Sequence, residues 1–190
     1  PNSLLESYNE ERLPNAKRLL STTDRVFDLA ASDEWFTSFV RKNVFPYVAN
    51  FALSFDAVKR IVFPLVSQIG ISYRESSLSE TVGSFAVKAG DRMPWLEIDG
   101  RSIYNDLRAP IFHLVIFSDA ASEILPLPDA LLNKWKERID SHVYPLDTKV
   151  QEAFGYNDPF FVILRPDNYI GLLSDDLSPN RIGQYLQKFE

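Results

Sequence analysis

The stretch Ile111-Phe112-His113-Leu114-Val115-Ile116-Phe117 is an almost continuous apolar run, and it decides the fold of this chain. Pro110 precedes the run, and the turn residues Ser118-Asp119 follow it. A strand with one solvated face alternates apolar and polar residues, so an unbroken apolar run is typical of a strand buried on both faces. The sequence therefore predicts a sheet that is covered on both sides.

The segments after this strand alternate between helical and extended patterns. They predict an amphipathic helix marked by Leu131, Leu132, Trp135 and Ile139, a strand at 142–146, a short helix ending at Gly155, strands at 159–164 and 169–173, and a last helix capped by Ser178. Strands joined through a helix pair in parallel, whereas the final two strands form an antiparallel hairpin. The predicted class is α/β with a mixed sheet, and this order of elements resembles the thioredoxin fold.

One proline has a special place in the thioredoxin fold. It stands just before the final hairpin, and the peptide bond that precedes it is cis. Pro159 occupies the matching place in this chain. The resemblance therefore implies a cis bond between Asp158 and Pro159, although cis is adopted by only about 5% of such bonds in folded proteins.

The residues ahead of this domain have the spacing of helices up to about residue 72. In the segment 4–16, apolar residues recur at helical intervals and charged residues fill the gaps. Pro14 lies inside this segment and lacks an amide hydrogen, which predicts a kink. Two further helices are predicted to begin near Ser32 and near Ser54, and the class is thus a helical N-terminal segment followed by an α/β domain.

A polar stretch separates the two parts. Residues 73–90 are rich in Ser, Glu and Gly, which predicts a surface connection. The pair Asp99-Gly100 then lies between two short extended runs and predicts a tight hairpin. The predicted organisation is a helical segment at 1–72, a linker at 73–90 and a thioredoxin-like domain without cysteines at 91–190.

The composition excludes several classes of function. The 190 residues contain no cysteine, which rules out disulfides, thiolate catalysis and iron–sulfur clusters. Ser118-Asp119-Ala120-Ala121-Ser122 stands where thioredoxins and peroxiredoxins place their attacking cysteine, so thiol exchange is excluded and a degenerate peroxiredoxin is remote. A net charge of −6 argues against nucleic acid as a partner. Neither a signal peptide nor a membrane-spanning run is evident, so a cytoplasmic protein is expected.

The polar residues form no recognisable catalytic set. The 7 glycines include no Gly-rich dinucleotide turn, so the chain alone is not expected to hold FAD. His113 and His142 stand far apart in sequence and are expected to be structural. The pair Asp175-Asp176 is expected to be solvated rather than to bind a metal. No catalytic, cofactor-binding or metal-ligating residue is predicted.

Four motifs stand out along the chain: the Tyr8–Ala16 segment, Gly90-Asp91-Arg92-x-Pro94, Gly100-Arg101-Ser102-Ile103-Tyr104 and Leu164-Arg165-Pro166-Asp167-x-Tyr169-Ile170. Taken in this order, they resemble the C-terminal region of FAD-dependent aromatic-ring hydroxylases, with the phenol hydroxylase branch as the best match. In that family helices follow the flavin-binding domain, and a cysteine-poor thioredoxin-like domain closes the polypeptide. The matches span nearly the whole chain.

The resemblance implies a role within a larger enzyme. The parent would use FAD, NAD(P)H and oxygen to hydroxylate a phenol-like ring, while this part would be structural: it would pack on the FAD-binding catalytic domain of the same polypeptide and support a homodimer. Tyr8, Glu11 and Arg12 are the residues expected to dock that domain. Pro1 in place of Met fits truncation as well as removal of an initiator Met. The alternative is a stand-alone, redox-inactive thioredoxin-fold scaffold or binding module.

Overall fold

The computed structural model describes residues 2–31, 70–118 and 133–189, together with a few positions between 39 and 51. The helix expected from Ser54 and most of the helix expected from Ser32 lie outside the described residues, as do Leu131 and Leu132 of the helix expected to reach Ile139. Of that last helix the structure describes a helical piece at 133–135 and a turn at 136–138. By its contacts the chain forms two compact units. The first comprises Pro1–Glu11 and Ser72–Glu190, and the second comprises Arg12–Ile71.

A single long helix opens the chain, as the sequence predicts. Helix α1 runs from Asn2 to Ala31 and contains Pro14 in its interior, so the proline does not end the helix. Its first ten residues belong to the first unit, and the remainder belongs to the second. Within the described residues, no helix combines the length and the apolar character that a membrane crossing requires.

A mixed five-stranded sheet forms the centre of the first unit. Its strands are β1 (Glu80–Val82), β4 (Phe112–Phe117), β5 (Ile139–Tyr144), β6 (Phe160–Leu164) and β7 (Ile170–Ser174), in the spatial order β1-β7-β6-β4-β5. Strands β4 and β5 are parallel, as are β1 and β7, while β6 runs antiparallel to both of its neighbours. The predicted α/β class with a mixed sheet is confirmed.

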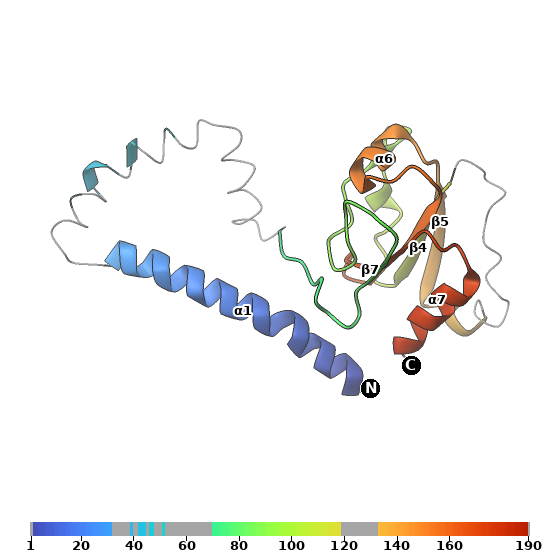
Figure 1. Ribbon diagram of the computed structural model, residues 1–190, viewed down its shortest axis with the longest axis horizontal. Coiled ribbons are helices and arrows are strands. Elements are labelled where there is room, and N and C mark those ends of the chain that lie inside the picture. Colours follow the sequence, from blue (N-terminus) through green and yellow to red (C-terminus); the bar gives the residue numbers. More distant parts are fainter. Residues whose placement is uncertain are drawn as a thin grey trace. The chain divides into compact units, whose positions relative to one another are not determined.

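Strand β4 lies inside this sheet, and all six of its residues are buried. Val115 belongs to the core on the side of helix α6 (Thr148–Phe154), and Leu114 belongs to the core on the side of helix α7 (Pro179–Leu186). Figure 1 shows these two helices on opposite faces of the sheet. The unbroken apolar run in the sequence is therefore explained by a strand with a helix on each side.

Local signals set the ends of several elements. Strands β2 (Glu97–Ile98) and β3 (Arg101–Ser102) form the predicted hairpin, in which Asp99 and Gly100 both take positive φ angles, 51° and 72°. Positive φ at both central residues is what a two-residue turn of this kind requires, and Gly adopts it without strain. A short 3₁₀ helix, Ile103–Asn105, follows directly.

The capping residues predicted from the sequence are observed more fully at helix α6 than at helix α7. The Asp147 side chain accepts the Val150 amide at the start of α6, and Gly155 ends that helix in the left-handed conformation, as predicted. Ser178 stands at the N-cap of α7 with Pro179 after it, but its side chain makes no capping hydrogen bond. A 3₁₀ turn, Gln187–Phe189, completes the described chain.

The prediction of a cis bond at Pro159 is wrong. The described residues contain no cis peptide bond, so Asp158 and Pro159 are joined in trans. Trans is the lower-energy form of such a bond by about 0.5–1 kcal/mol. Strand β6 begins at Phe160, directly after Pro159, and the chain reaches it through this trans bond.

Residues 73–90 differ from the surface connection that their composition predicts. They contribute β1, which pairs in parallel with β7, and they bury Tyr73, Leu78 and Phe85. The segment is thus part of the first unit. Ile139 is a second difference, since it begins β5 instead of continuing a helix.

Gly171 in β7 leaves no room for a side chain. A Cβ atom there would lie 1.9 Å from the hydroxyl oxygen of Tyr185, which is fully buried and donates to the Leu78 carbonyl oxygen at 2.9 Å. We expect Gly171→Ala to lower the free energy of unfolding by about 1–3 kcal/mol through overpacking. Urea unfolding followed by circular dichroism measures this loss.

The variant Tyr185→Phe tests whether the clash with the Tyr185 hydroxyl causes the loss of stability in Gly171→Ala. Removal of the hydroxyl takes away the atom nearest to the new methyl group, so G171A is expected to cost less in the Y185F background than in the native chain. Strictly additive losses in the double variant would contradict this explanation.

Candidate functional site

A buried ion pair joins the start of α1 to the turn after β6. The Arg165 guanidinium donates to both carboxylate oxygens of Glu11, from Nη1 to Oε1 and from Nη2 to Oε2, the latter at 2.9 Å. The two side chains are only 11% and 7% exposed. Nη2 of Arg165 also donates to Oδ2 of Asp167 at 2.9 Å, so one cation is held between two anions.

Two serines hold the neighbouring carboxylates of α1 in place. Ser76 Oγ donates to Glu11 Oε1 at 2.8 Å, and Ser77 donates to the Glu10 carboxylate from its amide and its hydroxyl. Burial by itself lowers the pKa of Arg165, but the hydrogen bond to Glu11 and the charges of Asp167 and Glu11 outweigh it and raise that pKa above its ordinary value. Arg165 is therefore fully charged, and the first turns of α1 are fixed to the α/β unit.

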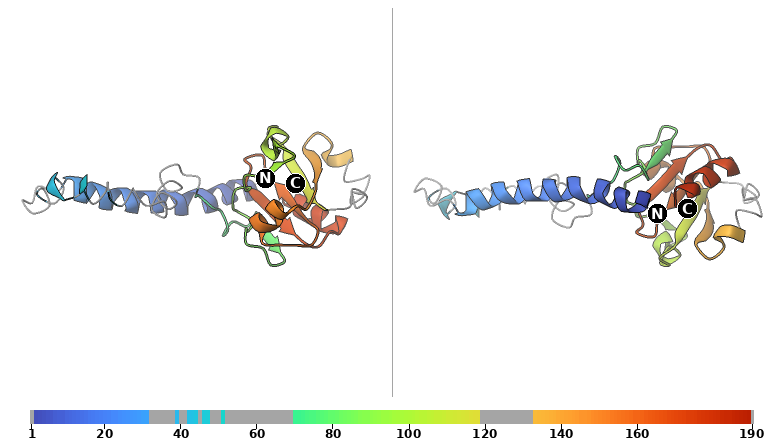
Figure 2. Two further views of the ribbon diagram at one scale, coloured as in Figure 1. Left: turned by 90° about the horizontal axis from the view of Figure 1, so that it is seen from above. Right: turned by 90° about the horizontal axis from the view of Figure 1, so that it is seen from below.

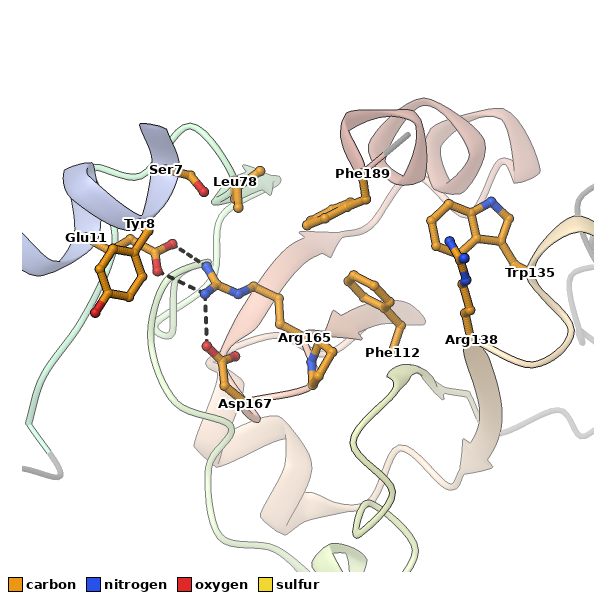
Figure 3. Close-up of a pocket in the computed structure, with 11 residues that line it drawn as sticks. Ser7, Tyr8, Glu11, Leu78, Phe112, Trp135, Arg138, Arg165, Asp167 and Phe189 are labelled. Carbon is orange, nitrogen blue, oxygen red and sulfur yellow. Dashed lines mark hydrogen bonds and ion pairs between the residues drawn. The ribbon is translucent and has the colours of Figure 1, made fainter. Parts of the chain in front are cut away.

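A pocket of about 440 Å³ lies beside this ion pair. Its lining comes from the start of α1, from the sheet and from the chain's end: Ser7, Tyr8, Glu11, Leu78, Phe112, Trp135, Arg138, Arg165, Pro166, Asp167 and Phe189. In Figure 3, Arg165 stands toward one side and Trp135 with Arg138 toward the other, with the rings of Phe112 and Phe189 between them. The beginning of α1 and the end of α7 lie side by side in all views (Figures 1 and 2).

The chemistry of this pocket is suited to binding. The rings of Phe112 and Phe189 pack at a centroid distance of 4.8 Å, and the Arg138 guanidinium lies 6.0 Å from the centre of the Trp135 ring. Of the lining residues that the structure describes, both carboxylates face Arg165, and none is a histidine or cysteine. A volume of this size is within the range of small-ligand pockets, and its walls favour a flat apolar group.

The three predicted docking residues lie in different surroundings. Tyr8 is 63% exposed and lines the pocket, whereas Glu11 is buried in the ion pair with Arg165. Arg12 is exposed and begins the second unit. The charged tie that was expected to a flavin domain is thus made by Glu11 within this chain, and docking of these residues to such a domain stays a prediction.

The two histidines, which the sequence analysis treats as isolated, lie together. Nδ1 of His113 is 3.3 Å from Nε2 of His142, and the same Nε2 is 3.3 Å from Oδ2 of Asp140. His113 is completely buried, and burial lowers the pKa of its ring. The parallel pairing of β4 with β5 brings these residues together, which spacing along the chain does not reveal.

Sequence reasoning also missed Arg165 and Trp135 as site residues. It assigned the first to a turn and the second to the apolar face of a helix, and both assignments are compatible with their place at the pocket. An arginine in a short turn points to a buried site only when its partner is known, and the partner of Arg165 lies 154 positions away.

The carboxylates of Asp175 and Asp176 accept hydrogen bonds within the chain. Asp175 accepts from the Tyr156 hydroxyl, and Asp176 accepts from the Ser178 amide.

The ion pair leads to a direct test. We expect Glu11→Gln to lower the free energy of unfolding of the first unit by about 3 kcal/mol, because it removes one partner of a buried pair and leaves the cation under-compensated. Glu6→Gln is the matched control, since that carboxylate lies on the same helix and is exposed, and little change is expected. Urea unfolding measures both, and equal effects of the two substitutions would contradict the assignment.

The sequence and the structure were both compared with those of known proteins. No family model matches the sequence, and no curated protein matches it. Among solved structures, 99% of the chain superposes on 36% of OxyS, an anhydrotetracycline hydroxylase from Streptomyces rimosus, with a TM-score of 0.59 and 20% identity. Similarly, 98% superposes on 36% of the rebeccamycin biosynthetic enzyme RebC, solved with reduced flavin, with a TM-score of 0.62 and 19% identity.

These likenesses establish the fold. The chain spans 36% of the length of each enzyme, and nearly the whole chain takes part in the match. The resemblance inferred from the sequence motifs is confirmed at the level of the fold: the chain has the fold of one part of a larger hydroxylase and of one part of a larger flavin-containing enzyme.

Proposed function

We propose that this chain is the C-terminal portion of an FAD-dependent monooxygenase that hydroxylates phenol-like aromatic compounds with NAD(P)H and oxygen. Its part in that enzyme is structural: it packs on the FAD-binding catalytic domain of the same polypeptide and supports association of two copies. The fold it shares with a hydroxylase and with a flavin-containing enzyme supports this proposal, as do the four motifs in the sequence.

The observation that carries the proposal is the apolar side of α1. Among the side chains of this helix that the structure describes, five large apolar ones are exposed by 45–67% of their surface: Tyr8, Leu13, Leu19, Leu20 and Phe27. At 100° per residue they fall within an arc of about 140°, away from Ser7 and Glu11, which are buried. Exposed apolar surface of this kind marks an interaction site, and a neighbouring domain of the same enzyme would cover it.

The described glycines do not form the Gly-rich turn of a dinucleotide site. A dinucleotide site needs a Gly-rich turn whose backbone approaches the pyrophosphate at the start of a helix. The described glycines with positive φ lie in four separate turns, and a Cβ at Gly90 would meet the backbone of Tyr73 and Arg74, so this close approach serves the chain's own packing. Flavin chemistry is therefore assigned to the rest of the enzyme.

The genome gives the decisive test of the whole proposal. We expect the reading frame to continue upstream of the codon for Pro1 and to encode a Gly-rich turn between a strand and a helix. The longer polypeptide is then expected to purify with FAD and to oxidise NAD(P)H when a phenol is added. An initiation codon directly before Pro1, preceded by an in-frame stop codon, would refute the proposal.

The exposed side of α1 gives a test on the chain itself. We expect the purified 190-residue chain to self-associate with rising concentration, because the apolar residues of α1 have no covering domain. The double variant Leu20→Lys/Phe27→Lys should shift sedimentation toward the monomer. Ser21→Lys, an exposed neighbour outside the apolar arc, should not. A native chain that stays monomeric at all concentrations would count against the proposal.

One observation favours the alternative of a stand-alone binding module. The described residues that line the aromatic pocket all belong to the first unit. A module of this kind would start at its own initiation codon and would be monomeric, so the two experiments above also separate the two functions.

A further inference from the structure

Strands β4 and β5 bring three potential metal ligands to one face of the sheet. Their parallel register pairs His113 with Asp140, and His142 lies two residues further along β5, so all three side chains leave the sheet on the same side. One ligand atom from each residue lies within 4.8 Å of the other two. Figure 1 shows the two strands side by side.

Backbone groups orient two of these ligands. Nε2 of His113 lies 3.0 Å from the carbonyl oxygen of Ala109, which can only accept, so Nε2 carries the hydrogen and Nδ1 presents its lone pair to His142. Oδ1 of Asp140 accepts the amide of Ser141 at 2.8 Å, and Oδ2 is left facing His142. Such fixing of the far atom of each ligand is a recurring property of metal sites.

The distances suit a metal ion better than a proton. Nε2 of His142 is 3.3 Å from Nδ1 of His113 and 3.3 Å from Oδ2 of Asp140, and a single N–H cannot point at both acceptors. Zinc bonds to nitrogen and oxygen are about 2.0–2.2 Å, so two ligands of a tetrahedral zinc ion lie roughly 3.3–3.5 Å apart. The two spacings that involve Nε2 of His142 match edges of such a tetrahedron, and Nδ1 of His113 lies within 4.8 Å of the Asp140 ligand oxygen.

We propose that His113 Nδ1, His142 Nε2 and Asp140 Oδ2 bind a zinc ion. Imidazole nitrogen favours zinc over magnesium or calcium, which prefer oxygen ligands. Asp140 is exposed and His142 is half-buried, so solvent reaches the site and supplies a fourth ligand. The ion joins β5, the edge strand of the sheet, to the buried strand β4. Its role is structural.

Calorimetric titration of the tag-free, chelator-treated 190-residue chain with zinc chloride tests this. We expect one ion per chain. Asp140→Asn and His142→Gln should each weaken zinc binding by at least about 10-fold. Mutation of a residue that only hydrogen-bonds to a metal ligand already weakens metal binding by about that factor, so loss of a ligand itself should cost no less. Asp99→Asn is the matched control, because this exposed carboxylate stands in the β2–β3 turn, and it should leave binding unchanged.

A measurement on the native chain keeps the test valid if a variant fails to fold. Nitrogen NMR of the histidine rings should show Nδ1 of His113 and Nε2 of His142 shifting on addition of one equivalent of zinc, while Nε2 of His113 stays protonated. Absence of stoichiometric binding, binding that D140N and H142Q leave intact, or unshifted ring nitrogens would each overturn the proposal.

Discussion

The buried pair of Glu11 and Arg165 is the interaction on which the arrangement of the first unit depends. It connects positions 154 residues apart, so it fixes the first turns of α1 against the end of β6. Two charges taken out of water lose more hydration than their attraction restores unless further groups compensate them. Asp167 and Ser76 provide that compensation, and the pocket beside the pair exists because α1 is held there.

The sequence predicts the sheet well because its strands carry strong local signals. The apolar run of β4, the Asp99-Gly100 turn and the left-handed cap at Gly155 each depend on neighbouring residues alone. Strand β1 gives no such signal, since it is three residues long, only partly buried, and held by backbone pairing with β7. The cis bond expected at Pro159 came from the fold resemblance and not from any local requirement, and there the prediction failed.

The candidate sites are much harder to predict than the fold, for a physical reason. Each depends on a tertiary contact between residues that look ordinary in their own segments. Arg165 looks like a turn residue until Glu11 is placed beside it, and His113 looks like an isolated core histidine until the register of β4 and β5 brings His142 to it. The spacing of residues along the chain reveals the face of one helix or strand on which they lie. It does not reveal which residues of two paired strands stand opposite each other, because that depends on how the sheet assembles.

The environment of Trp135 has an optical consequence. Of the two described tryptophans, Trp135 is 3% exposed and Trp95 is 67% exposed, so their indoles emit from apolar and aqueous surroundings respectively. Trp135 also lines the pocket, beneath the cation of Arg138. A molecule that entered the pocket would lie against the wall that this ring and the Arg138 guanidinium form. The short-wavelength part of the protein's fluorescence is thus a built-in reporter of what occupies that space.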